Sequence, residues 1–417
     1  MASLGKLSMS AARSDNRVSV LEAIRRNRGI SRAELAIATG LTPAAISKIV
    51  GGLLEAGLVI ESGYTASGGG RPRVRLGINP EAAYVIGVDL ARSGICAALV
   101  NLDGLILRRY SVASTLAHPI DVTVARLLDL LDELMQDAGP DRAKIVGVDI
   151  GAPGPLSVRN GVILSPPNFA GWRDVPLREI VERHLGIPVW IDNDANACAL
   201  AEAWLGAGQA FSHFVYVAVG TGVGAGLVIN GALYRGANDI AGEFGHTTVE
   251  ASGPRCGCGN VGCLELYTSA SAITSAAIAA IRRGEPSIVV EWVQGHLEEI
   301  TVNLLVRAAR CADRLAIRVF EQSARYLGVG VVNLVNLFDP EAVFLGREVI
   351  REAEDLLLDP IRAMVSERAF SIAASRVRIL PATLGEEAPV LGAACLALQE
   401  LFRSPERLAA LTAGGKA

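Results

Sequence analysis

One histidine and three cysteines lie close together near the middle of the chain, in the stretch GHTTVEASGPRCGCGNVGCLE. One imidazole and three thiols suit a tetrahedral zinc ion with no open coordination position, which is typical of a structural site. A redox pair is less favoured because the spacings are C-x-C and C-x4-C rather than C-x-x-C. Packing of the cysteines in a core is the remaining alternative. We predict structural Zn2+ bound by His246, Cys256, Cys258 and Cys263.

The size and composition of the chain indicate a soluble protein of several domains. It has 417 residues, 51% of them hydrophobic, which is enough for two or three domains. Its most apolar runs, such as YLGVGVVNLVNLF, are too short to span a membrane, so no membrane partner is expected. The start, MASLGKLSMSAARSDN, lacks the apolar segment of a signal peptide, which favours the cytoplasm. Seven cysteines do not suit a disulfide framework, and we expect four of them in the core: Cys96, Cys198, Cys311 and Cys395.

Basic residues are concentrated at the N-terminal end of the chain. Residues 1–77 contain 11 Lys and Arg against 5 Asp and Glu, whereas the remainder contains 28 against 38, within a total net charge of −4. A basic head on an acidic body is typical of a nucleic-acid-binding module joined to a domain that does not bind nucleic acid. A solvated basic helix would give the same count, so charge alone does not decide.

The head is predicted to contain three helices, of which the last two form a helix-turn-helix. RVSVLEAIRRN has the apolar spacing of the first helix. SRAELAIATG opens with a capping box between Ser31 and Glu34. LTPAAISKIVGGLLEAG begins with Thr42 as an N-cap and has a proline in its first turn. Wing strands at 58–61 and 74–78 would complete a winged helix-turn-helix.

The third helix and the wing segment are the expected DNA-binding surface. Small and polar residues on the outward face of that helix can approach base edges in a major groove. The arginines of GGGRPR can enter a narrow minor groove. The residues we expect at operator DNA are Thr42, Ala44, Ala45, Ser47, Lys48, Arg71 and Arg73. The alternative is a three-helix interaction module followed by a glycine linker.

Beyond residue 80 the pattern changes to strands alternating with helices. YVIGVDL, GICAALVNLDG and LILRRYSV are predicted strands, followed by a helix at 120–137 and a strand at IVGVDIG. A similar run begins at HFVYVAVGTGVGAGLVINGALY. Two similar halves predict a two-lobed α/β body with a cleft between the lobes.

Several motifs together resemble the ROK family of repressors, open reading frames and sugar kinases. They are GVDL…LVNLDG, VAVGTGVGAGLVING, DNDAN and, most specifically, GEFGH…CGCGNVGC, and the winged head resembles the repressor branch. The resemblance implies an actin/hexokinase-like (ribonuclease H-like) α/β body, a sugar site, a structural zinc and a homodimer or homotetramer. The expected domains are a small α+β winged helix-turn-helix over 1–80 with a Gly/Arg linker and a body over 81–417. Within the body, an N-lobe at about 81–195 plus the C-terminal helix accompanies a C-lobe at about 196–385.

The resemblance also implies which residues hold a sugar. Carboxylates and amides suit this task because each ring hydroxyl both donates and accepts hydrogen bonds. By resemblance, the zinc-bound histidine also faces the sugar. The residues implied are Gly154, Asn168, Asn193, Asp194, Glu243, His246 and Glu265.

The nucleotide motifs separate a repressor from a kinase. In the kinases of the family, the aspartate corresponding to Asp194 is the general base, and a D-x-G-G-T turn cradles the phosphates. Here that turn reads DLARSG, with Ala91 and Arg92 in place of glycines, and Arg347 replaces one glycine of a later pair. The loop GTGVGAG is intact. We therefore predict no catalytic residue and a repressor of carbohydrate-utilisation genes that binds operator DNA and a sugar effector. The alternatives are an ATP-dependent, glucokinase-like sugar kinase with a DNA-binding head and a ligand-free interaction hub.

Overall fold

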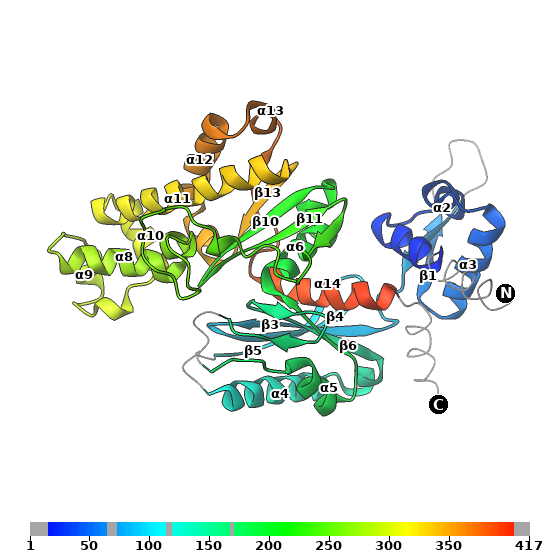
Figure 1. The fold of residues 1–417 in the computed structure, drawn as a ribbon. Helices are drawn as coiled ribbons and strands as arrows, with labels where there is room; N and C mark the ends of the chain where they lie inside the picture. Colours follow the sequence, from blue (N-terminus) through cyan, green and yellow to red (C-terminus); the bar gives the residue numbers. More distant parts are fainter. Residues whose placement is uncertain (1–15, 65–72, 114–118, 167–170, 404–417) are drawn as a thin grey trace.

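The computed structural model describes residues 16–64, 73–113, 119–166 and 171–403 (Figure 1). A small N-terminal head is followed by a body of two α/β lobes, each built on a five-stranded sheet. The predicted order of a winged head and a two-lobed body is therefore present in the structure.

The head has the predicted elements and caps. Its helices cover residues 16–26, α2 Arg32–Thr39 and α3 Pro43–Glu55, and its antiparallel wing strands are β1 Val59–Tyr64 and β2 Val74–Ile78. The capping box is confirmed, because the Glu34 backbone donates to Ser31 Oγ while the Ser31 backbone donates to Glu34 Oε2 at 2.8 Å. Thr42 caps α3 by accepting from the backbone of Ala45. Between α2 and α3 the chain turns by 115°, as in other helix-turn-helix units.

Both lobes contain a sheet of the same strand order. The first sheet runs β5-β4-β3-β6-β9, with β3 Tyr84–Ala91, β4 Gly94–Asn101, β5 Ile106–Ala113, β6 Ile145–Ala152 and β9 Val189–Asn193. The second runs β12-β11-β10-β13-β14, with β10 Phe214–Val219, β11 Val223–Ile229, β12 Ala232–Tyr234, β13 Ala342–Gly346 and β14 Arg378–Pro381. In each sheet the first three strands in chain order are antiparallel and the last two are parallel to the first. The repeat predicted from the sequence is therefore a structural repeat.

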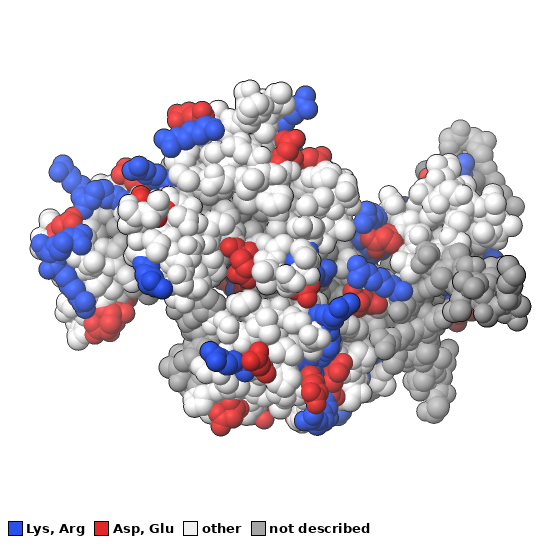
Figure 2. Space-filling view, viewed as in Figure 1, with Lys and Arg blue, Asp and Glu red and all other residues white. Residues whose placement is uncertain are grey.

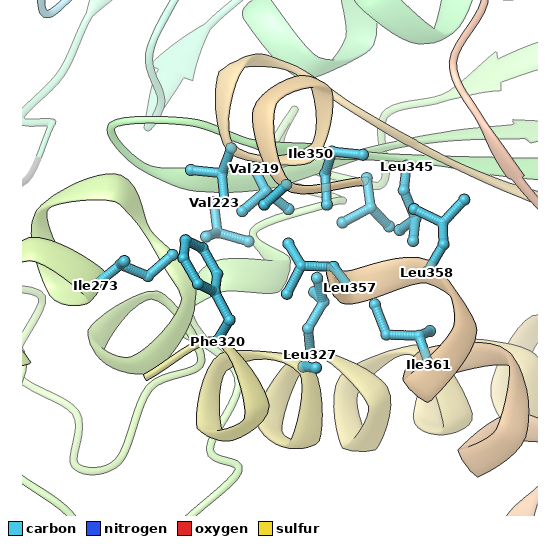
Figure 3. Close-up of a cluster of buried hydrophobic side chains, with 14 of the residues drawn as sticks. Val219, Val223, Ile273, Phe320, Leu327, Leu345, Ile350, Leu357, Leu358 and Ile361 are labelled. Carbon is cyan, nitrogen blue, oxygen red and sulfur yellow. The ribbon is translucent and has the colours of Figure 1, made fainter. Parts of the chain in front are cut away.

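Helices cover both faces of each sheet. The first lobe has α4 Ile120–Asp137, α5 Leu177–Leu185 and the short strands β7 Leu156–Ser157 and β8 Val162–Ile163. The second has α7 Glu265–Thr268, α8 Ala270–Arg282, α9 Val289–Trp292, α10 Val302–Arg310, α11 Arg314–Phe338, α12 Glu348–Arg368 and α13 Ser371–Ala374. Apolar side chains of α11 and α12 pack against the second sheet, as Figure 3 shows for Phe320, Leu327 and Leu357. That cluster is the largest core of the body.

Two helices occupy the space between the lobes. They are α6 Asp194–Trp204 and the C-terminal α14 Ala388–Phe402 (Figure 1). A Cβ at Gly392 of α14 would lie 1.9 Å from the Ala197 carbonyl oxygen of α6, and one at Gly226 of β11 would lie 2.5 Å from that of Ala195. Only glycine permits such close backbone approach, so α6 is held tightly against both neighbours.

The expectation that four cysteines lie in the core is half right. Cys198 and Cys395 are buried, Cys96 is half-buried beside Arg109, and Cys311 is exposed. The prediction for Cys311 was wrong because it caps the C-terminus of α10 in the turn that leads to α11. Among the described residues no single helix is long and apolar enough to cross a membrane, and the one bent pair that passes by length and composition is the helix-turn-helix itself.

Candidate functional site

A polar cleft lies between the lobes, where the carboxyl ends of strands from both sheets meet. This is the edge at which open α/β sheets bind ligands. The loops after β3, β6 and β9 contribute from the first sheet, and those after β10 and β13 from the second. The lining residues are Ala91, Arg92, Pro153, Gly154, Asn193, Asp194, Ala218, Gly220, Thr221, Gly222, Val223, Gly224, Gly242, Glu243, His246, Glu265 and Arg347.

Asn193 and Asp194 are fixed at the N-terminus of α6. Asn193 is its N-cap, with Oδ1 accepting from the backbone of Ala195 and Asn196 at 2.9 and 3.3 Å. Asp194 Oδ1 also accepts from the Ala195 backbone at 2.9 Å. Burial raises the pKa of the Asp194 carboxyl, while the guanidinium of Arg347 opposes that rise. The helix end thus presents an amide and a carboxylate to the cleft.

Glu243 and Gly154 meet Asn193 on one side of the cleft. A Cβ at Gly154 would lie 2.5 Å from Glu243 Oε1 and 3.2 Å from Asn193 Nδ2, so a larger residue there would displace both side chains. Burial, followed by the charges of Asp194 and Glu265, raises the pKa of Glu243 to about 7. Glu265 is buried and its Oε2 accepts from the Val223 backbone at 3.0 Å. The cleft therefore holds several hydrogen-bonding groups suited to hydroxyls.

Arg347 projects into the same cleft from the end of β13. Its Nη1 lies 3.2 Å from Oδ2 of Asp89 and its Nη2 3.7 Å from Oδ2 of Asp194. Arg92 also lines the cleft, and its Cζ lies 3.6 Å from where a Cβ of Gly222 would be. Two arginine side chains thus stand where the resemblance places glycines of nucleotide loops.

The cysteine and histidine cluster forms a compact knuckle beside the cleft. The four candidate ligand atoms, of His246, Cys256, Cys258 and Cys263, lie within 4.8 Å of one another. Cys256 Sγ is 3.7 Å from His246 Nδ1, and Cys258 Sγ is 3.7 Å from Cys263 Sγ. A tetrahedron with Zn–S bonds of about 2.3 Å has edges of roughly 3.8 Å, so the residues fit a zinc ion.

A tight turn builds this knuckle, and His246 joins it to the cleft. The Cys256 backbone donates to the Asn260 carbonyl at 2.8 Å, and the Gly259 backbone donates back to Cys256 at 3.0 Å. Gly262 has φ +66°, and a Cβ there would lie 1.7 Å from the Glu250 carbonyl oxygen. Because His246 lines the cleft as well, a bound metal would fix the orientation of its ring.

The predicted DNA-contacting residues on α3 lie on the surface of the head. Thr42, Ala44, Ser47 and Lys48 are exposed and Ala45 is half-buried, while Ile46, Val50 and Leu53 of the same helix are buried. Arg73, which directly precedes β2, is exposed. Arg71 lies outside the described residues, as does Asn168 among the sugar candidates.

The head contacts the body through an aromatic side chain at the end of α6. The guanidinium of Arg25 stacks 3.7 Å above the ring of Trp204 and makes two hydrogen bonds to Glu22. Phe402 of α14 stacks on the same ring, with centroids 6.1 Å apart. Arg28 and Asp103 form a further ion pair at 3.7 Å, and Figure 2 shows basic and acidic side chains gathered at this junction. The junction between head and body therefore combines a cation–π contact, a ring stack and an ion pair.

Comparison with known proteins supports the expected relationship. Residues 85–400 match the ROK family and residues 14–66 the MarR family. The chain belongs to the ROK family. It is 36% identical to a protein of Caldicellulosiruptor sp. (strain Rt8B.4) named putative xylose repressor, over 94% of this chain and 97% of that one.

Solved structures extend the match to the arrangement of domains. A ROK family transcriptional regulator, homolog of E. coli MLC protein, superposes with a TM-score of 0.83 at 30% identity over 96% of this chain and 100% of that one. A ROK glucokinase from Streptomyces griseus, in complex with glucose and AMPPNP, gives 0.68 at 34% identity over 75% and 99%. The glucokinase therefore corresponds to the body alone. The predicted fold class and the repressor branch with a winged head are confirmed.

The structure brings most of the predicted site residues together. Six of the seven sugar candidates line one cleft, the exception being Asn168, which is not described. The sequence reasoning noted Arg347 only as a replaced glycine and missed its pairing with Asp89 and Asp194. It also missed Trp204 as the contact of the head. No local pattern marks either residue, because their partners lie far away along the chain.

Proposed function

We propose that this ROK protein represses carbohydrate-utilisation genes by binding operator DNA and that a sugar in the cleft between the lobes modulates this binding. Helix α6 is the observation that carries the proposal. It begins at Asp194 in the cleft and ends at Trp204 beneath Arg25 of the head. Eleven helical residues span about 16 Å, so a displacement of its first turn by a bound sugar would reach the head directly.

Uncharged sugars are the first effectors to test, and xylose leads because relatives that are 36% and 34% identical to this chain are named putative xylose repressor and xylose repressor. The described sugar candidates would bind the ring hydroxyls, with Asp194 acting as a hydrogen-bond acceptor. The Zn2+ ion would be structural, held by His246 and the three cysteines. We further propose that two or four copies assemble, so that two heads read a symmetric operator.

The competing function is that of a sugar kinase with a DNA-binding head. Asp194 is present for it, and relatives that are 33% identical over 76% and 75% of this chain are named glucokinases. Against it stand Ala91, Arg92 and Arg347 at the nucleotide side of the cleft. The relatives that match over nearly the whole chain are named as repressors. We therefore propose that the cleft senses a sugar without phosphorylating it.

Operator binding, sugar binding and phosphoryl transfer measured on one preparation test this function. We expect operator affinity to fall when sugar is added, and Asp194→Ala to bind operator normally while losing about 1.5–3 kcal/mol of sugar affinity. The variant should therefore act as a super-repressor. Turnover with ATP and Mg2+ on the order of 1 per second or faster would instead establish the kinase.

A further inference from the structure

Arg347 joins the two lobes at the centre of the cleft. It follows β13 of the second sheet, whereas its partners Asp89 and Asp194 belong to β3 of the first sheet and to α6. Only 19% of its side chain is exposed. The two carboxylate partners lie 3.2 and 3.7 Å from separate nitrogens of one guanidinium. An arginine fork can hold two such groups in a defined orientation, which a point charge cannot.

The backbone of Arg347 is in a conformation that favours glycine. Its φ is 73° and its ψ is −174°, a region that residues with a Cβ almost never occupy. Such a conformation persists only where the surroundings fix it, and it is concentrated at functional sites. Here Arg347 donates a hydrogen bond to Asp89 at 3.2 Å and forms a longer ion pair with Asp194 at 3.7 Å, and both contacts favour this conformation. The backbone conformation at this position disfavours an arginine, so the contacts of its side chain must offset that cost.

Removing the guanidinium would leave two acidic groups facing one another in a partly buried cleft. Asp89 has one buried carboxylate oxygen, Oδ1, for which the described residues offer no hydrogen-bond partner. Like charges at such a site disfavour ionisation of one of the pair. The arginine thus favours the charged form of Asp194, which is a hydrogen-bond acceptor in the cleft that Asn193 and Glu243 also line.

The charges around the cleft also bear on the kind of ligand. Asp194, Glu243 and Glu265 line it together with Arg92 and Arg347, and Arg347 is already shared between two carboxylates. A phosphate or carboxylate group on the ligand would meet these three acids beside two guanidinium groups that already interact within the protein. A hydroxyl group would meet acceptors that suit it.

We propose that Arg347 is a positioning residue for the effector, which holds Asp194 toward a hydroxyl of an uncharged sugar and fills the space that a phosphoryl group would need. The inference rests on the proposed sugar-sensing function. It adds a residue to the site and excludes sugar phosphates as the effector class.

Calorimetric titration of the full-length protein with xylose, glucose and their phosphates tests the inference. Arg347→Gln should bind the preferred uncharged sugar at least 10-fold more weakly, and Arg347→Lys should recover part of that loss. Arg347→Gly should bind as weakly as Arg347→Gln although it relieves the backbone. Arg351→Gln is the matched control, because Arg351 lies one turn further along α12 and pairs with Glu386 at the surface. It should stay within twofold of the unaltered protein.

The outcomes separate this inference from the proposed function. If the unaltered protein binds no sugar, the sensing function is refuted and the inference with it. If the unaltered protein binds sugar and Arg347→Gln binds it within twofold, the inference alone is refuted. Tighter binding of a sugar phosphate than of the parent sugar would also overturn the assignment of an uncharged effector.

Discussion

Cys258 is the most exposed of the four side chains in the cysteine and histidine knuckle. Its Sγ lies 3.7 Å from Sγ of the buried Cys263, so it would complete a tetrahedron of zinc ligands from the solvent side. Replacing it removes one ligand without opening a cavity in a core. A substitution at Cys258 therefore tests metal binding without disturbing core packing, whereas substitutions at the two buried cysteines would affect both.

Cys258→Ser should lower the zinc content from about one ion per chain toward zero and lower the unfolding temperature by several degrees, because metal binding contributes directly to folding. Elemental analysis and calorimetry of the purified protein measure both effects. Cys311→Ser is the control, since Cys311 is exposed and outside the knuckle. The zinc assignment is wrong if protein purified without chelators contains no stoichiometric metal.

Glu243 should make stability depend on pH in the neutral range. Its pKa is about 7 in the folded protein, above the ordinary value of 4.5, so the folded state binds the proton more tightly. The contribution of this tighter proton binding to the free energy of unfolding is fully present below pH 4.5 and is lost as the pH rises through about 7. Glu243→Gln does not titrate, so its stability relative to the unaltered protein should increase between pH 5 and pH 8 by on the order of 1–2 kcal/mol.

Urea denaturation at a series of pH values measures this difference. Glu341→Gln is an informative control because backbone hydrogen bonds from His213 and Ser212 lower the pKa of Glu341. Stability from a lowered pKa is present above about 4.5 and is lost only in more acidic solution, so this variant should show a constant difference between pH 5 and pH 8. A pH-independent difference for Glu243→Gln would contradict the assigned shift.

At the scale of elements, α3 is the part of the head whose outward face is predicted to enter a major groove. Its inner face is fixed by Ile46, Val50 and Leu53, which leaves Ser47 and Lys48 exposed. The helix begins at a capped turn and follows α2 at 115°. The apolar residues thus set the orientation of α3 in the head, and we expect the exposed ones to select the operator sequence.

Lys48→Ala should weaken operator binding by about 1–3 kcal/mol and reduce discrimination between operator and unrelated DNA, as expected for a base-edge contact. Mobility-shift titrations at one salt concentration measure both quantities. Lys144→Ala is the control, because Lys144 lies in the body and pairs with Asp141. Equal losses on operator and unrelated DNA would assign Lys48 to the phosphates instead, and an unchanged affinity would mean that it does not contact DNA.

In the whole molecule, α6 lies between the lobes and reaches from the cleft to the head, which also packs against residues of β3, β4 and α14. Gly226 and Gly392 allow its neighbours to approach closely, so α6 has little freedom to move independently of them. Its first residue, Asp194, lines the cleft, and its last residue, Trp204, contacts Arg25 of the head. The coupling between sugar and DNA is expected to pass through this rigid element and through the contact of Trp204 with Arg25.

Trp204→Leu should preserve sugar affinity and operator affinity when each is measured alone and should reduce their coupling. Allosteric couplings are typically about 1–3 kcal/mol, and we expect most of this to be lost. Operator titrations with and without saturating sugar give the coupling directly. Trp292→Leu is a matched control, because Arg307 also lies over the Trp292 ring, at 5.1 Å, in a part of the body remote from the head. Unchanged coupling in Trp204→Leu would rule out this route.

Patterns that are local in the sequence were sufficient for the elements and for the metal cluster. Apolar periodicity predicted the helix at Ile120–Asp137 with its observed bounds, and a capping box predicted the start of α2. The metal candidates lie within twenty residues of one another, so a short turn was enough to bring them together. The physical reason is that capping, amphipathicity and tight turns depend on neighbours a few residues away.

The contacts on which the proposed function rests depend on the tertiary structure. Arg347 and Asp89 are 258 residues apart, and only the packing of two sheets around α6 and α14 places them 3.2 Å from one another. The stacking of Arg25 on Trp204 likewise joins the first helix to the sixth. No periodicity in the sequence encodes such pairs, because long-range contacts arise from how whole elements bury their apolar faces. Local patterns therefore account for which elements form and which reactive groups they contain, whereas the packing of the elements sets which of these groups face one another.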